Sequence, residues 1–212
     1  MRILGVVGSN RKDGNSYLLI REMLRNVSHE TKIVQMAELN IKPCELCFEK
    51  CAPKPFECAL NDDFQKLFAE MTQADEIILA CPFYFYVPSK FQAFLERVSC
   101  LDYFTQERHG EDKNPLKGKP CLLVAVSASG SSFNAFQILH HLQEFALMMQ
   151  MKPVTSRFWP FIGFSAKAGG IEKGSILKET ETMKRAREWT NLLIKDVRTS
   201  KSKICKAFYF GY

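Results

Sequence analysis

Four cysteines in the first third of the chain have a spacing that suits iron chemistry. They follow the pattern C-x2-C-x3-C-x6-C and lie within fifteen residues: Cys44, Cys47, Cys51 and Cys58. Thiolates are the ligands that iron–sulfur clusters use, and four nearby cysteines can hold one cubane cluster. A four-cysteine zinc site usually pairs two C-x2-C-like knuckles, and the last interval here is too wide for that. The pattern favours a [4Fe–4S] cluster, with a loop that binds nothing, a zinc site or a redox disulfide as alternatives.

The other cysteines, Cys81, Cys100, Cys121 and Cys205, are scattered along the sequence. The chain carries no secretory signal pattern and no apolar run near the roughly 18 residues of a membrane span. We therefore expect a soluble cytoplasmic protein with no membrane association. In a reducing compartment, eight cysteines do not indicate a disulfide framework.

A second chemical feature is the polar loop 8–14, GSNRKDG, between an expected strand and an expected helix. Backbone amides and hydroxyls beside a helix N-terminus form an anion site. The candidate phosphate donors are Ser9, Arg11, Asn15 and Ser16. The glycine spacing fits neither G-x-G-x-x-G nor a Walker loop, which leaves a mononucleotide phosphate. The alternative is an ordinary polar turn, although such turns usually have about two to six residues.

Two further loops suit a flat heterocycle. One follows an apolar strand and holds the run Pro82, Phe83, Tyr84, Phe85 and Tyr86, whose rings can stack on a ligand, fill the core or form a dimer surface. The other has small residues with free amides, suited to a ring edge: Ser127, Ala128, Ser129 and Gly130. Together the loops favour a nucleotide-like ligand with a large ring, and FMN fits that description.

The periodicity of apolar residues predicts the elements that carry these loops. Expected strands are residues 2–7, 31–36, 76–80, 121–126 and a fifth within 154–162. Expected helices are residues 15–26, 62–71, one starting near Pro88, 132–149 and 176–198. The cysteine-rich loop, residues 41–60, is an insertion after the second strand. We expect one domain, residues 1–198, followed by a basic and aromatic tail, residues 199–212.

Strands that alternate with helices indicate an α/β fold with a parallel sheet covered on both faces. Five strands suit the doubly wound order 2-1-3-4-5. Such sheets bind ligands beyond the carboxyl ends of the strands, where the strand order reverses. All three loops are expected to meet there.

The stretches GSNRKDGNS and CPFYFYVPSKFQAFLERV, with this element order, resemble the NAD(P)H-dependent FMN reductase group of flavodoxin-like proteins over roughly residues 1–165. The resemblance implies that the first loop binds the FMN phosphate. It also implies that the aromatic loop flanks the isoalloxazine and that the loop from Ser127 to Gly130 completes the ring site. Cys81 departs from the Ser or Thr more frequent in that group, and we expect it to be a small core residue.

The cysteine loop resembles that of the iron–sulfur flavoproteins, a branch of the same superfamily with a pattern close to C-x2-C-x2-C and a fourth cysteine. This sequence has one extra residue between Cys47 and Cys51. The resemblance implies FMN, a [4Fe–4S] cluster and a homodimer or homotetramer that brings one subunit's cluster near another's flavin. NAD(P)H or ferredoxin is the implied electron donor.

The sequence thus favours an oxidoreductase that transfers electrons between FMN and a cluster, in which the cofactors carry the chemistry and no side chain is a catalytic acid or base. The alternatives are an NAD(P)H-dependent FMN or quinone reductase without a cluster, and a non-enzymatic flavodoxin-like module with a zinc-braced loop. The net charge is +6, and much of it lies in the basic C-terminal region. We expect that region to be solvated or to dock an acidic partner such as ferredoxin, and not to bind nucleic acid.

Overall fold

The computed structural model describes residues 1–110, 114–129, 131–155 and 163–198. Its strands are β1 (Arg2–Val7), β2 (Glu30–Gln35), β3 (Glu76–Pro82), β4 (Pro120–Ser127), β5 (Lys152–Pro153) and β6 (Phe164–Lys167). They form one sheet with the order β2-β1-β3-β4-β5, and β6 also pairs with β4. Every pairing is parallel. The expected flavodoxin-like order 2-1-3-4-5 is confirmed.

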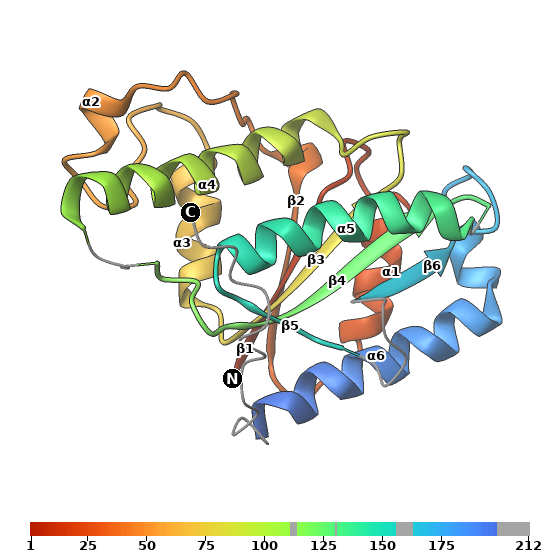
Figure 1. Cartoon of the computed structure of the whole chain (residues 1–212). Helices are drawn as coiled ribbons and strands as arrows, with labels where there is room; N and C mark the ends of the chain where they lie inside the picture. Colours follow the sequence, from red (N-terminus) through yellow and green to blue (C-terminus); the bar gives the residue numbers. More distant parts are fainter. Residues whose placement is uncertain (111–113, 130, 156–162, 199–212) are drawn as a thin grey trace.

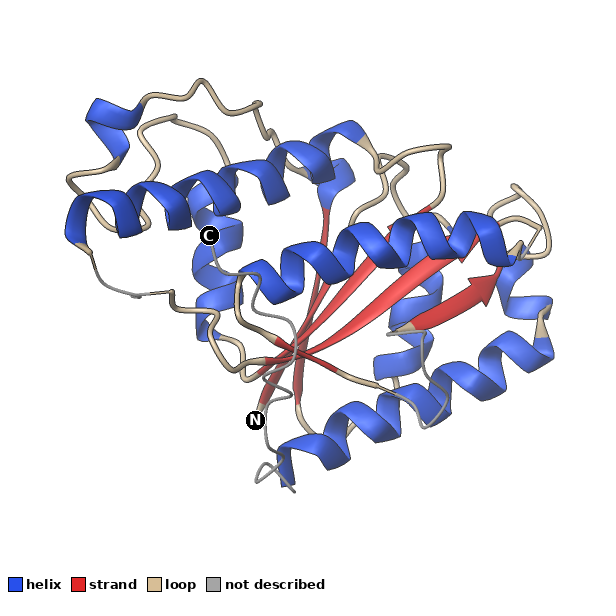
Figure 2. Ribbon diagram, in the orientation of Figure 1, coloured by secondary structure: helices blue, strands red, loops and turns tan. Residues whose placement is uncertain are grey.

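Helices cover both faces of the sheet, as Figure 2 shows. They are α1 (Asn15–Leu24), α2 (Phe48–Cys51), α3 (Phe64–Gln73), α4 (Ser89–His109), α5 (Ser132–Met148) and α6 (Thr180–Arg198). Two short 3-10 turns, η1 (Met36–Glu38) and η2 (Ser175–Lys178), complete the described elements. One core lies between the sheet and α3, α4 and α5, and the other lies under α1 and α6. No helix among these residues is both long and apolar enough to cross a membrane.

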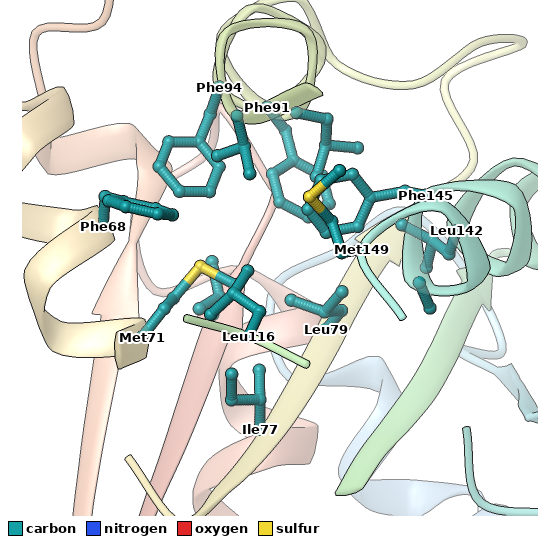
Figure 3. Close-up of a cluster of buried hydrophobic side chains, with 14 of the residues drawn as sticks. Phe68, Met71, Ile77, Leu79, Phe91, Phe94, Leu116, Leu142, Phe145 and Met149 are labelled. Carbon is teal, nitrogen blue, oxygen red and sulfur yellow. The ribbon is translucent and has the colours of Figure 1, made fainter. Parts of the chain in front are cut away.

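The larger core fixes α4 and α5 above the central strands. In Figure 3, Phe91 of α4 lies beside Phe145 and Met149 at the end of α5, and Phe94 lies on the side of Phe68 of α3. All five side chains are buried. Because burying such side chains contributes about 1.5–3 kcal/mol each, this layer holds the start of α4 firmly against the sheet. The loop before α4 therefore has a rigid base.

The fifth strand differs from its expected range. Two short segments lie beside β4 in its place: β5 opposite Pro120 and Cys121, and β6 along the second half of β4. Gly163, just before β6, has a φ of 106°, and a Cβ there would lie 2.6 Å from the Leu123 carbonyl oxygen. Such a backbone belongs to a turn and not to a continuous strand. Residues 156–162 of the expected strand lie outside the described residues.

The last helix begins later than expected, at Thr180 instead of residue 176. The first turn of the expected helix is η2, and Glu179 then leaves the helical region with a ψ of 85°. The tail, residues 199–212 with Cys205, lies outside the described residues.

Candidate functional site

The polar loop after β1 is held closely against the neighbouring strand and helix. The Gly8 amide donates to the Ala80 carbonyl oxygen at 2.7 Å. A Cβ at Gly8 would lie 2.2 Å from the Phe91 ring, so only glycine permits this approach of α4. Ser9 is buried and its Oγ accepts a bond from the Arg11 amide at 3.0 Å. The backbone of the predicted phosphate loop is therefore well ordered by packing.

The N-terminus of α1 faces this loop and has no side-chain cap. Its N-cap is Gly14, which has no side chain to cap the helix, although its carbonyl oxygen accepts from the Leu18 amide at 3.0 Å. Within the described residues no other side chain caps this end, and no acidic residue lies in the first turn. Ser16 is buried in that turn. Helix N-termini carry unpaired N–H groups and a partial positive charge, both of which attract anions. The loop and the helix end therefore have the chemistry of a phosphate site.

The aromatic loop contacts the polar loop directly. The Ser9 Oγ and the Tyr84 hydroxyl lie 3.1 Å apart, and the Tyr84 amide donates to the Tyr86 carbonyl oxygen at 3.3 Å. Phe85 lies at the turn between them with a φ of 62°, a strained conformation for a bulky residue. The Phe85 residue is 79% exposed and Tyr86 is 83% exposed. Strain and apolar exposure together are typical of a binding loop.

The loop after β4 lies beside the aromatic loop. The Phe83 amide donates to the Val126 carbonyl oxygen at 2.8 Å, just before the buried Ser127. Ala128 and Ser129 are exposed. Because β1, β3 and β4 are neighbours, the structure brings all three loops to one sheet edge, visible in Figure 1 beyond the carboxyl ends of β3 and β4. Pro82 ends β3, and Gly130 lies outside the described residues.

A fourth segment that sequence reasoning missed also reaches this edge. Asn15 holds it: its Nδ2 donates to the Glu172 carbonyl oxygen and to the Ser175 Oγ, both at 3.0 Å, and its Oδ1 accepts from the Gly174 amide at 2.9 Å. Arg11 Nη1 donates to the Ile171 carbonyl oxygen at 2.6 Å. Asn15 thus anchors the segment 170–175, and its role toward phosphate stays a prediction. Three glycines between residues 169 and 174 were the available signal of a turn there.

A depression of about 340 Å³ borders the exposed side of the aromatic loop, on the side of α5. Its lining residues come from that loop, from α4 and from α5: Phe85, Tyr86, Val87, Gln92, Gln137, Ile138 and His141. Most of its surface is aromatic, aliphatic or amide. The aromatic loop therefore separates the polar loop from an open, partly apolar hollow.

The cysteine loop packs against the outer side of α4, away from the sheet (Figure 1). Cys47 and Cys51 are one helical turn apart at the two ends of α2, and their Sγ atoms lie 3.6 Å from each other. Burial, together with the Cys47 and Cys58 sulfurs nearby, raises the pKa of Cys51 to about 11. Cys51 therefore lies close to two of the other predicted ligands, Cys47 and Cys58.

The fourth predicted ligand lies next to a cysteine from α4. Burial and the neighbouring Cys44 thiol raise the pKa of Cys100 to about 12, and Cys51 contributes as well. Cys100 is far from the four predicted ligands in sequence but lies close to Cys44 and Cys51 in space. Its position on α4, three residues after Arg97, gave no direct signal, because the cysteines come together only when the loop folds onto the helix.

Hydrogen bonds fasten the cysteine loop along α4. The His109 Nε2 lies 2.9 Å from the Ala52 carbonyl oxygen, and Arg97 Nη2 donates to the Cys58 Sγ at 3.0 Å. In the described residues no three metal-binding side chains converge as a finished site. The donor set nevertheless fits an iron–sulfur cluster, because it offers four thiols around a one-turn helix.

Comparisons with known proteins agree with this geometry. A family model described as NADPH-dependent FMN reductase matches residues 1–164. An iron–sulfur flavoprotein of Methanocaldococcus jannaschii is 29% identical over 145 residues, which are 66% of this chain and 70% of that protein. An iron–sulfur flavoprotein of Methanosarcina thermophila is 32% identical over 144 residues, 66% of this chain and 71% of that protein.

Solved structures show the same fold at low identity. A flavone reductase superimposes with a TM-score of 0.66 at 20% identity, over 96% of this chain and 66% of that one, so this chain spans slightly less than two thirds of its length. A Trp repressor binding protein from Bacillus subtilis gives a TM-score of 0.61 at 16% identity, over 89% of this chain and 99% of that one.

Proposed function

Because the chain belongs to the NADPH-dependent FMN reductase family, and is an FMN-dependent oxidoreductase of flavodoxin-like fold, we propose that it is an iron–sulfur flavoprotein. In this proposal it binds FMN at the sheet edge and one [4Fe–4S] cluster in the cysteine loop. FMN exchanges one or two electrons and a cubane cluster exchanges one, so the pair can convert between two-electron and one-electron carriers.

For FMN, the proposal assigns the phosphate to the polar loop and the uncapped start of α1. The support is the absence of a side-chain cap at Gly14, the buried hydroxyls of Ser9 and Ser16, and the Arg11 guanidinium at the loop surface. The ring is assigned to the aromatic loop and to the exposed backbone at Ala128 and Ser129. A single phosphate loop suits FMN better than FAD.

For the cluster, the single observation that carries the proposal is the gathering of Cys44, Cys47, Cys51 and Cys58 on one loop against α4. The relatives named iron–sulfur flavoproteins support it. The one-turn helix α2 absorbs the extra residue between Cys47 and Cys51, since positions four apart lie on the same face of a helix.

We also propose a cytoplasmic homodimer or homotetramer that takes electrons from NAD(P)H or from an acidic protein such as ferredoxin. The seven cysteines among the described residues are all free, which suits a reducing compartment. Exposed aromatic side chains on the aromatic loop and on α5, such as Phe85, Tyr86 and Phe133, suit a contact between subunits.

The absorbance spectrum of anaerobically purified full-length protein, with metal and flavin analysis, tests the proposal. The expected result is iron, broad absorbance beneath the flavin bands, and FMN as the released flavin. Flavin bands without iron would identify a plain FMN or quinone reductase. Zinc without flavin would identify a non-enzymatic module, and stoichiometric FAD would contradict the phosphate assignment.

A further inference from the structure

Arg97 is a charged residue buried inside α4, with 1% of its side chain exposed. It lies three residues after Phe94 and four before Leu101, so helical spacing places it on the apolar face of α4. A buried guanidinium is costly unless partners satisfy its charge and its N–H groups. The partners it has therefore indicate what the side chain does.

One terminal nitrogen of the guanidinium links the cysteine loop and the residues just after it to α4. Its Nη1 donates to Asp62 Oδ2 at 2.5 Å and to the Lys42 carbonyl oxygen at 3.2 Å. Burial opposes ionisation of Asp62, but bonds from Arg97 and two backbone amides hold the pKa of this carboxyl below its ordinary value. The Phe64 ring lies under the guanidinium, with Cζ 4.2 Å from its centroid. Asp62 thus balances the charge of Arg97.

The other terminal nitrogen of the guanidinium faces the sulfur atom of Cys58. Arg97 Nη2 lies 3.0 Å from Cys58 Sγ, a close approach for an N–H···S contact. The Cys58 backbone is fixed too, because its amide donates to Gln65 Oε1 at 3.1 Å. A neutral thiol is a weak acceptor, whereas a metal-bound thiolate carries negative charge and accepts well. This buried donor is therefore suited to a sulfur that ligates a metal.

We propose that Arg97 is a positioning residue that orients Cys58 as a cluster ligand and raises the reduction potential of the cluster. The inference rests on the proposed cluster and deepens it. A cubane held by four thiolates is anionic and gains one more negative charge on reduction. A hydrogen bond to a ligand sulfur from a cation favours the reduced, more negative form. The Asp62 carboxylate partly opposes this effect by its own charge.

The test compares cluster and flavin midpoint potentials in the same anaerobic samples of full-length protein. Arg97→Lys keeps the charge but shortens the side chain and loses the planar fork. We expect this variant to retain FMN and to show a lower cluster potential. Asp62→Asn removes the opposing carboxylate, so its cluster potential should rise. A purely structural tether gives no reason for shifts of opposite sign. Arg108→Lys, an exposed substitution on the same helix, should leave both potentials unchanged.

The outcomes separate this inference from the proposed function. A parent protein that assembles no cluster overturns both. A parent with a cluster whose potential is the same in Arg97→Lys and Asp62→Asn overturns the role of Arg97 alone. If a variant fails to fold, unaltered protein labelled with 15N-arginine still tests whether Arg97 contacts the cluster. Electron–nuclear double resonance of the reduced cluster should detect coupling to that nitrogen, and its absence contradicts the contact.

Discussion

At the scale of single residues, Arg11 is the charged donor nearest the proposed phosphate. Its guanidinium donates to the Ile171 carbonyl oxygen at 2.6 Å through Nη1, and its other N–H groups can donate to an anion. Arg11→Ala should weaken FMN binding by about 1.5–3 kcal/mol, because a charge-assisted hydrogen bond is lost. This corresponds to a roughly 10- to 100-fold higher Kd, measured by flavin fluorescence titration.

The matched control for Arg11 is its neighbour Lys12. Lys12 pairs with Glu38 at 2.6 Å on the surface and is not assigned to the phosphate. Lys12→Ala should leave the FMN Kd within a factor of about two, as surface ion pairs contribute little. Equal losses in both variants would mean that general positive charge, and not a specific Arg11 contact, attracts the flavin.

Cys51 and Cys100 provide a second residue-scale comparison, since both thiols lie close to other cysteines where the loop meets α4. The proposal makes Cys51 a ligand and Cys100 a neighbour. Cys51→Ala should lose iron and keep FMN, and Cys100→Ala should keep both. Iron and flavin analysis of anaerobic protein measures this. Iron loss in Cys100→Ala would mean that Cys100 of α4 is itself a cluster ligand, which contradicts the assignment made here.

At the scale of elements, the contact between the polar loop and α4 decides the geometry of the flavin site. A Cβ at Gly8 would meet the Phe91 ring at 2.2 Å, whereas at Gly14 the nearest atom would be 3.4 Å away. Gly8→Ala should therefore cost about 1–3 kcal/mol of unfolding free energy and weaken FMN binding. Gly14→Ala should lower both the unfolding free energy and the FMN affinity by less than Gly8→Ala does. Urea unfolding and flavin titration measure the two effects, and similar values for the two variants would refute the packing argument.

The sheet edge opposite the flavin loops carries a buried carboxyl at the start of β3. Glu76 is fully buried, and neither carboxyl oxygen has a hydrogen-bond partner in the part of the chain that the structure describes. Burial and the Asp75 charge raise its pKa to about 7. Between about pH 4.5 and pH 7, Glu76 is therefore protonated in the folded protein and ionised in the unfolded chain. Stability from this group is full below about pH 4.5 and is lost as pH rises through 7, by roughly 3 kcal/mol.

Glu76→Gln removes this titration. Thermal unfolding of the parent and the variant between pH 5 and pH 8 should show a variant whose melting temperature falls less as pH rises. At pH 8 the variant should be the more stable of the two. Parallel curves across this range would show that Glu76 is not protonated in the folded state near neutrality.

Sequence periodicity predicted the central strands and the edge strand β2 well, and the edge beside β4 poorly. β3 and β4 are buried on both faces, so their continuous apolar runs stand out in the sequence. The edge position beside β4 is shared by β5 and β6, and the turn at Gly163 depends on contact with Leu123, which no local pattern encodes.

The candidate site was predictable to a similar degree. Loops that follow strands β1, β3 and β4 must meet once the strand order is known, so the convergence of Ser9 and Tyr84 could be expected. The segment that bonds to Asn15 and the Arg97 contact to Cys58 join residues far apart in sequence. An arginine on the apolar face of α4 was the available signal, since a buried charge requires a partner.

At the scale of the whole molecule, α4 connects the two proposed cofactor sites. It begins beside the polar loop, where Asn10 Nδ2 donates to Ser89 Oγ at 3.4 Å, and it carries Arg97 against the cysteine loop. At 1.5 Å per residue these two positions are about 12 Å apart along the helix. One rigid element thus fixes the spacing between the flavin edge and the cysteine loop.

The most direct test of the account is the stoichiometry of iron, acid-labile sulfide and FMN in full-length protein prepared without oxygen. The account predicts iron and sulfide in equal amounts, each about four per FMN. Protein that binds one FMN but neither iron nor sulfide, even after anaerobic reconstitution with both, would contradict it.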